Sequence, residues 1–383
     1  MASQHLFRSA ALVVLIAACA ETKRSVEAEV EPETEVVSEG PNLGTQGNQI
    51  AGGAKGGASN GQKSDAELCK ATATQRALPV PLHLVVVFDA SKSMIDAKYE
   101  GPEGGTTNRF DATRNALTEY AKLKQLTDLY MSVVPFGLPA PLEGGVGEDQ
   151  CVAEYYVPLL KDTKLPAPGT VSTMLEGLES KGSTPTAGGV LGALAYAKRV
   201  KAKYPTHNVA LVLATDGDAN NCGGSTGAVI ALKKAQTAGF NTFVIGIADA
   251  PGGISSLDAM AVAGGTKTPV MIDGNSAKEV TKKMNAKFQD IRTSFSCELA
   301  IPATLPDSSE PVNKSSINVQ LTDGAGVKSQ LVYSQDCSKN NAFYYDDAAN
   351  PTKVLLCEDT CSLVRSDVNF AQDMYFGCPS KVN

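Results

Sequence analysis

The sequence predicts an α/β fold, with a doubly wound, mostly parallel sheet followed by a small disulfide-rich β module at the C-terminus. Apolar runs of strand length alternate with helical patterns between residues 82 and 295, which is typical of a parallel sheet covered on both faces. After residue 297, short apolar runs stand among cysteines instead. The 383 residues are 43% hydrophobic, so the chain can bury one large core and a second small one.

Residues 1–18 are expected to be a signal peptide. Arg8 precedes the apolar run "AALVVLIAA", which has the length of a signal-peptide core and is too short to span a bilayer comfortably. The run ends in "IAAC", Ile16 to Cys19, which resembles a bacterial lipobox. The resemblance implies that Cys19 is lipidated; the alternative is an ordinary signal peptide with a coincidental cysteine. Because Ala20 is not aspartate, the resemblance implies a lipid-anchored envelope protein in the outer membrane, facing the periplasm or the exterior.

Residues 19–66 differ in composition from the rest of the chain. Glycine-rich sequence follows a first half crowded with glutamates, namely Glu21, Glu27, Glu29, Glu31, Glu33, Glu35 and Glu39. Such a segment has too little apolar surface to offset the entropy of ordering, so we expect a disordered acidic and Gly-rich tether.

Residues 67–296 are expected to form the α/β domain. Five apolar residues from Leu84 to Phe88 make 82–89 a fully buried strand. A helix follows from Asn108, its expected cap, because Phe110 and Leu117 share one helical face. The further strands are expected at 129–137, 154–160 (an edge strand), 207–215, 241–248 and 268–273. The further helices are expected at 186–200, 225–239 (capped by Ser225 or Thr226), 254–264 and 276–295.

Oxygen side chains follow the ends of these strands. Asp89, Ser91 and Ser93 come at the carboxyl end of the first strand, and Asp216 comes at the same end of a later one. Thr184 lies in the loop that enters the helix between them. In open α/β sheets, ligands bind beyond the carboxyl ends of the strands, where the strand order reverses. Two carboxylates and three hydroxyls make a hard-oxygen environment suited to Mg²⁺ or Mn²⁺.

This order of motifs resembles a von Willebrand factor type A (VWA) domain with a metal-ion-dependent adhesion site, over about residues 79–295. The family pattern is D-x-S-x-S, then a threonine, then T-D-G, matched here by "DASKS", "GSTPT" and "ATDGD". The resemblance implies that Ser91 and Ser93 bind the cation directly and that Asp89 and Asp216 act mainly through water. Thr184 is the expected threonine, with Thr186 as the alternative register. The sixth ligand is then an acidic group of a protein partner.

The nine cysteines predict disulfides, because eight remain in an exported chain once Cys19 is lipidated. With only three histidines in the chain, a zinc site is not expected. Cys151 and Cys222 lie on the metal face and are expected to bond. Cys69 and Cys297 are expected to bond at the base of the sheet. Three connectivities remain open for the other four cysteines, Cys337, Cys357, Cys361 and Cys378.

Residues 297–383 are expected to form the disulfide-stapled β module. Ile317, Val319 and Leu321 alternate with polar residues and precede a DG turn, which predicts a hairpin. Further short strands are expected in "AFYYD", "TKVLLC" and "DMYFGC". By its cysteine layout, the whole arrangement is similar to a group of envelope lipoproteins from predatory and gliding delta-type bacteria.

Binding is therefore the leading functional hypothesis: an envelope-anchored protein that captures an acidic side chain of a partner through bound magnesium. One alternative is an envelope scaffold in which the metal only stabilises loops, and a third is a metal-dependent hydrolase. Catalysis is not expected, because His83 and His207 have no nucleophile in an identifiable pairing. The net charge of −7 argues against nucleic acid as a partner.

Overall fold

The computed structural model describes residues 73–96, 98–101, 105–217, 219–248, 255–273, 276–366, 371–378 and 380. The predicted signal peptide, Cys19 with its expected lipidation, the predicted tether and Cys69 lie outside the described residues. Within the described part of the chain, no helix combines the length and the apolar composition needed to cross a membrane.

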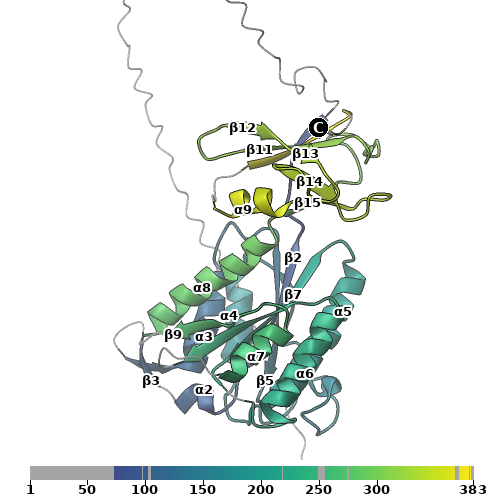
Figure 1. The fold of residues 1–383 in the computed structure, drawn as a ribbon. Helices are drawn as coiled ribbons and strands as arrows, with labels where there is room; N and C mark the ends of the chain where they lie inside the picture. Colours follow the sequence, from purple (N-terminus) through teal and green to yellow (C-terminus); the bar gives the residue numbers. More distant parts are fainter. Residues whose placement is uncertain are drawn as a thin grey trace, which may run out of the picture. The chain divides into compact units, whose positions relative to one another are not determined.

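A six-stranded sheet forms the centre of the α/β part (Figure 1). Its strand order is β6-β5-β2-β7-β8-β9. Neighbouring strands are parallel except for the edge strand β6, which is antiparallel to β5. The strands are β2 (Leu82–Asp89), β5 (Leu129–Phe136), β6 (Leu160–Lys164), β7 (Asn208–Thr215), β8 (Thr242–Ala248) and β9 (Val270–Asp273). This confirms the predicted doubly wound, mostly parallel sheet.

The chain order reverses between β2 and β7, which lie side by side at the centre of the sheet. From β2 the chain proceeds outward to β5 and β6 on one side, and it then returns to β7 and continues outward on the other side. In a doubly wound sheet this reversal opens a crevice at the carboxyl ends of the two central strands. Asp89 ends β2 and Asp216 follows β7 directly, so both acids lie at this crevice.

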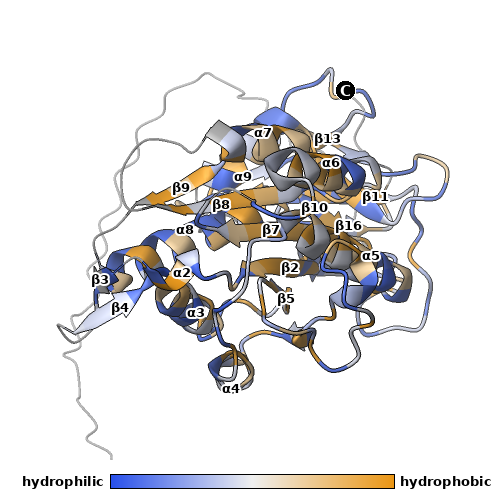
Figure 2. Cartoon of the chain, turned by 90° about the horizontal axis from the view of Figure 1, so that it is seen from below, coloured by the Kyte–Doolittle hydropathy of each residue, from blue (hydrophilic) through white to orange (hydrophobic). Residues whose placement is uncertain are grey.

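Two layers of helices bury the two faces of the sheet. One face packs against α3 (Arg109–Tyr120), α4 (Pro168–Glu176) and α8 (Ala277–Ser294). The opposite face packs against α5 (Thr186–Lys203), α6 (Gly224–Thr237) and α7 (Ser255–Ala263). Figure 2 shows the hydrophobic strands β2, β7 and β8 between these layers. All eight residues of β2 and of β7 are buried, which is why both read as continuous apolar runs.

Helix caps explain where several helices begin. The Asn108 side chain accepts a hydrogen bond from the Asp111 amide at 2.8 Å, so the predicted cap of α3 is confirmed. The Ser276 side chain caps α8 in the same way. The predicted Ser225 or Thr226 cap of α6 is wrong, because α6 begins after Gly223, whose left-handed φ of 81° forms the entry turn.

The predicted edge strand at 154–160 is displaced. Ala153–Tyr155 form a short 3-10 helix, and β6 begins only at Leu160. Pro158 cannot donate to a sheet, and Tyr155 and Tyr156 are buried against the face of α5. The segment between the first strand and the Asn108 cap also contains structure that the sequence pattern did not indicate, namely α2 (Ser93–Asp96), β3 (Lys98–Glu100) and β4 (Thr106–Asn108).

The C-terminal module has a core of its own, built from two four-stranded sheets. The first has the order β1-β16-β11-β12 and contains the predicted hairpin, β11 with β12. The second has the order β10-β15-β14-β13. The elements are β1 (Ala73–Arg76), β10 (Glu298–Ala300), β11 (Ile317–Thr322), β12 (Lys328–Gln330), β13 (Val332–Tyr333), β14 (Ala342–Tyr345), β15 (Lys353–Leu356), α9 (Glu358–Ser366) and β16 (Ala371–Phe376).

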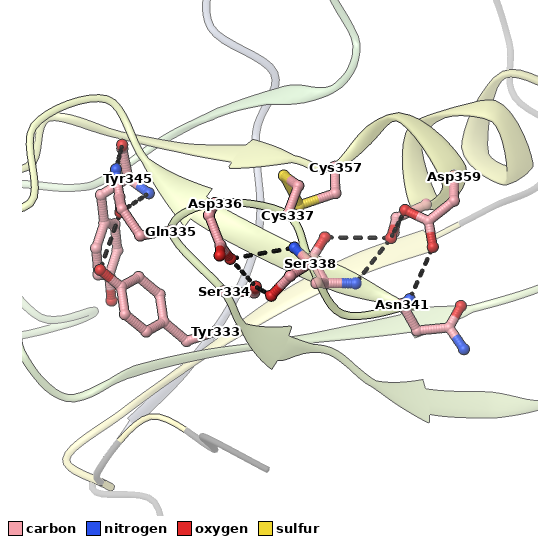
Figure 3. Close-up of a disulfide and its surroundings, with 12 residues drawn as sticks. Tyr333, Ser334, Gln335, Asp336, Cys337, Ser338, Asn341, Tyr345, Cys357 and Asp359 are labelled. Carbon is pink, nitrogen blue, oxygen red and sulfur yellow. Dashed lines mark hydrogen bonds between the residues drawn. A yellow bond between two sulfur atoms is a disulfide. The ribbon is translucent and has the colours of Figure 1, made fainter.

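Disulfides staple this module. Cys337 bonds Cys357, and the loop around Cys337 is held by Asp336, which accepts hydrogen bonds from Ser334 and Ser338 (Figure 3). Cys297 bonds Cys361. Cys378 is disulfide-bonded as well.

The predicted bond between Cys69 and Cys297 is therefore wrong. Cys297 directly precedes β10, and its carbonyl accepts a hydrogen bond from the Leu356 amide at 2.9 Å. Cys361 lies on α9, which begins just after β15. The pairing of β10 with β15 thus brings α9 to Cys297, and the sequence spacing alone did not indicate α9.

Candidate metal site

Asp89 is the centre of a polar cluster at the carboxyl ends of β2 and β7. Its side chain is fully buried, with an exposed fraction of 0%. One carboxylate oxygen accepts a hydrogen bond from the Ser91 amide at 2.8 Å, and the other accepts one from the Thr215 hydroxyl. Thr215 is the last residue of β7, so the two central strands are joined through this carboxylate at the crevice.

Ser91 and Ser93 continue the cluster from Asp89 to Asp216. The hydroxyl oxygens of Ser91 and Ser93 are 3.1 Å apart, and the Ser93 hydroxyl donates to the Asp216 carboxylate at 2.9 Å. Ser93 is the first residue of α2, which places its side chain at a helix start. The structure thus brings four of the five predicted side chains together by hydrogen bonds from two strand ends. We call Asp89, Ser91, Ser93, Thr184 and Asp216 the oxygen cup.

Thr184, the fifth residue, lies in the adjoining loop. The Gly182 carbonyl of this loop accepts a hydrogen bond from the Lys92 amide at 2.9 Å, and the Ser180 hydroxyl donates to the Ser91 carbonyl. The Thr184 amide donates to the Asn220 side chain at 2.8 Å, which ties the loop to the segment after β7. Among the described hydrogen bonds, none joins the Thr184 hydroxyl to the other four cup side chains.

Glycine at position 137 permits this close packing. Gly137 follows β5 with a φ of 78°, and a Cβ atom there would lie 2.7 Å from the Ser91 nitrogen and 2.8 Å from the Ser183 carbonyl oxygen. Only glycine adopts this conformation freely and leaves room for both loops. The close approach of three loops therefore depends on the glycine that follows β5.

Arg109 also belongs to the site, although the sequence analysis did not identify it. Its guanidinium donates to the second carboxylate oxygen of Asp216 at 2.7 Å, and both side chains are largely buried, with exposed fractions of 14% and 2%. Arg109 is the first residue of α3, directly after the Asn108 cap. The Asn108 cap predicted from the sequence where this helix begins. No sequence motif indicated that the first residue of the helix contacts Asp216.

The charges of the cluster fit a cation. Burial, and next the neighbouring Asp216 carboxylate, raise the pKa of Asp89 to about 6, although hydrogen bonds from Ser91 and Thr215 lower it. Within the described part of the chain, no Lys, Arg or His forms an ion pair with Asp89, whereas Asp216 has Arg109. A buried carboxylate without a cationic partner is costly. A divalent cation beside Asp89 would relieve this cost, and hydroxyl and carboxylate oxygens are the ligands that Mg²⁺ and Mn²⁺ prefer.

The described residues contain no group of three or more His, Cys, Asp or Glu side chains arranged to hold a metal. The oxygen cup is of another kind, since three of its five side chains are hydroxyls. Such a set leaves more positive charge on the cation than an all-carboxylate site would, and it therefore favours an additional anionic ligand.

The raised pKa of Asp89 predicts a pH dependence of cation binding. Since the cation competes with the proton on this carboxylate, the affinity for Mg²⁺ should fall about tenfold per pH unit below the pKa of about 6 and level off above it. In the metal-free protein, the unfolded chain loses the Asp89 proton at a lower pH than the folded chain does, because the pKa of Asp89 is raised from 3.8 to about 6 on folding. The free energy of unfolding of the metal-free protein should therefore decrease as the pH rises from 3.8 to about 6. Calorimetric titration with Mg²⁺ between pH 5 and 8 measures the first effect; an affinity that does not change over this range would contradict it.

Arg109 should weaken cation binding through its charge. Replacing Arg109 with glutamine removes a positive charge next to Asp216, so Mg²⁺ should bind about tenfold more tightly. Replacing it with lysine keeps the charge and should leave the affinity within about twofold of the wild type. Calorimetry on both variants distinguishes the electrostatic effect from a structural one, because weaker binding by both would mean that Arg109 positions Asp216.

A disulfide connects two loops beside the cup. Cys151 bonds Cys222, as expected from their shared face of the domain. Next to it, the Ser183 hydroxyl donates to the Gln150 side chain at 3.3 Å and accepts from the Asn221 side chain at 2.8 Å. The residues before Cys151 and before Cys222 therefore hold the loop that carries Thr184.

Comparison with known proteins gives structural likenesses only. No family model matches the sequence, and no curated protein does. Among solved structures, the pilus adhesin SpaC from Lactobacillus rhamnosus GG is 16% identical at a TM-score of 0.42, and the match covers 78% of this chain and 39% of that chain. The vWF domain of the type V pili tip protein Mfa5 from Porphyromonas gingivalis is 11% identical at 0.37, covering 57% and 97%. Manganese-loaded TRAP from Plasmodium vivax is 12% identical at 0.36, covering 75% and 96%.

Proposed function

We propose that this chain is an envelope protein of the VWA type that binds a protein partner through a divalent cation held in the oxygen cup. The observation that carries the proposal is the cluster itself: Asp89, Ser91, Ser93 and Asp216 come from the ends of two adjacent strands and form a continuous set of hydrogen bonds. The D-x-S-x-S and T-D-G motifs in "DASKS" and "ATDGD" supply these residues. The cation is Mg²⁺ or Mn²⁺.

Each cup residue has a proposed role. The Ser91 and Ser93 hydroxyls bind the cation directly, and the Asp89 and Asp216 carboxylates act through bound water. Thr184 binds directly or through water from the adjoining loop. With neutral oxygens as its direct protein ligands, the cation keeps enough charge to attract a carboxylate from the partner. An acidic side chain of the partner therefore completes the coordination.

The proposed activity is binding and not catalysis. His83 and His207 are the histidines of the described chain, and their ring nitrogens lie 3.0 Å apart. They lie at the amino ends of β2 and β7, the edge of the sheet opposite the oxygen cup. Burial lowers the pKa of His83 to about 4, so this ring is neutral at pH 7 and serves packing against Tyr130. No general base from this pair reaches the cup.

We further propose that a lipid on Cys19 anchors the protein in the outer membrane and that the tether connects this anchor to the α/β domain. A lipid anchor in the outer membrane would hold many copies on one surface. A single bridging carboxylate gives a weak contact, but many tethered copies act together and raise the effective affinity. Weak individual contacts of this kind suit adhesion between surfaces or between envelope proteins.

A capture experiment tests the proposal. The purified protein, immobilised as bait, is incubated with envelope extract in magnesium, in chelator, and as an Asp89→Ala bait in magnesium. A protein retained only by the wild-type bait in magnesium, and released by chelator, is the expected result. The same proteins recovered in all three conditions would contradict metal-bridged binding and favour a scaffold that makes its contacts elsewhere.

A further inference from the structure

A groove of about 710 Å³ runs between α5 and α6, on the face of the sheet opposite α3 and α8. From α5 it is lined by Leu191, Leu194, Ala195 and Lys198. The spacing i, i+3, i+4, i+7 places these four side chains in one stripe along the helix. The stripe is apolar at its start and cationic at its end.

From α6 the groove is lined by Ile230, Lys233, Lys234 and Thr237, which repeat the same spacing. Ile230 has an exposed fraction of 54%, although isoleucine is among the residue types most often buried. Both helices begin at the carboxyl edge of the sheet, so the two stripes run in the same direction. Each stripe therefore begins with an apolar residue, Leu191 or Ile230, and has its lysines further along the same groove.

Within the residues that the structure describes, the lysines of this groove have no acidic partners. Neither α5 nor α6 contains an aspartate or glutamate, although the chain as a whole has a net charge of −7. Lys233 donates to the Gln236 amide oxygen at 2.9 Å, and within the described part of the chain none of Lys198, Lys233 and Lys234 forms an ion pair with a carboxylate. Elsewhere on α5, Lys203 does pair with Asp162.

We infer that the α5/α6 groove binds an acidic amphipathic segment of a protein partner, with apolar side chains in the hollow and carboxylates on the three lysines. Charge complementarity argues for the acidic character. The apolar stripe argues for a segment with apolar residues on one side, as in the binding of a helix to a groove. Each stripe covers eight residues of its helix, a rise of roughly 10 Å, which matches about two turns of a bound helix. A membrane surface fits less well, because an interfacial helix buries one continuous apolar face in the lipid, whereas the apolar residues here line a groove between two helices together with lysines.

A displayed library of random 15-residue peptides, selected on the full chain, tests this inference independently of the oxygen cup. The enriched peptides should combine aspartate or glutamate with regularly spaced apolar residues. Their affinity, measured by fluorescence anisotropy, should fall at least tenfold for Lys198→Glu/Lys233→Glu/Lys234→Glu and for Ile230→Asp. The second variant introduces one negatively charged residue at an exposed site, so it keeps the test valid if the triple variant is unstable.

Two controls separate the groove from other effects. The triple variant Lys124→Glu/Lys161→Glu/Lys282→Glu makes the same change in net charge at exposed lysines outside α5 and α6, and it should bind the peptides as the wild type does. Asp89→Asn should bind them as well, so a failure of metal binding does not affect this result. Enriched peptides that bind the groove variants unchanged would overturn the inference. So would a library without enriched peptides, or groove variants that lose only binding to anionic phosphatidylglycerol vesicles.

Discussion

Asparagine in place of Asp89 is expected to abolish the stabilisation of this protein by magnesium. The wild type should gain about 2.7 kcal/mol in free energy of unfolding when Mg²⁺ is present at 100 times its Kd, which raises Tm by several degrees. Asparagine has the shape of aspartate but lacks the charge that a cation compensates. Thermal melts in magnesium and in chelator measure the difference between the two conditions for each protein.

The same substitution should not destabilise the metal-free protein. Because burial raises the pKa of Asp89, its ionised form opposes folding at neutral pH, and a neutral asparagine removes this cost. In chelator the variant should therefore melt at or above the Tm of the wild type. A variant that melts far below the wild type in chelator would show that Asp89 is structural. A variant that still gains stability from magnesium would place the cation elsewhere.

Serine in place of both Cys151 and Cys222 is expected to lower stability and cation affinity together. The disulfide closes a loop with a sequence separation of 71, for which the chain-entropy relation gives about 4 kcal/mol. Its removal also frees the residues that hold Ser183 next to Thr184. Urea unfolding measures the first effect, and calorimetric titration of the folded variant with Mg²⁺ measures the second, a decrease in affinity of about tenfold.

The disulfide between Cys337 and Cys357 provides the matched control. It closes a loop with a sequence separation of 20 in the C-terminal module, so its removal should cost about 3 kcal/mol by the same relation. The affinity for Mg²⁺ should remain unchanged, since none of its residues contacts the oxygen cup. Equal losses of affinity in both double variants would mean that cation binding responds to global stability and not to the loop beside Thr184.

The central strands and four of the five cup residues could be predicted from the sequence because their signals are local. A strand buried on both faces must read as a continuous apolar run, as β2 and β7 do. Polar residues that directly follow such strands must meet at one edge of a parallel sheet. Asp89, Ser91, Ser93 and Asp216 lie at or just beyond the carboxyl ends of these two strands. The structure joins them by hydrogen bonds.

Other features depend on contacts between distant parts of the chain. Arg109 reaches Asp216 across 107 positions, and neither residue's neighbours in sequence indicate this contact. Cys297 bonds Cys361 because β10 pairs with β15, which the sequence spacing does not show. The cap of α6 is a glycine backbone conformation and not a side-chain hydrogen bond, so the preference for serine and threonine at caps gave the wrong residue.

The α5/α6 groove combines both kinds of signal. The absence of acidic residues from α5 and α6 is visible in the sequence, but each helix alone reads as an ordinary amphipathic helix with a solvated basic end. Only their packing side by side turns two stripes into one groove with Ile230 exposed at its apolar end.

The most direct measurement for the central claim is an anomalous-scattering map from crystals of this protein grown with Mn²⁺. A single strong peak is expected in the oxygen cup, with the Ser91 and Ser93 hydroxyl oxygens as direct ligands and with Asp89 and Asp216 next to it. A carboxylate from a neighbouring molecule or from added acetate should complete the coordination. A cup without a peak at a saturating Mn²⁺ concentration, or a peak held by other residues, would contradict the proposed function.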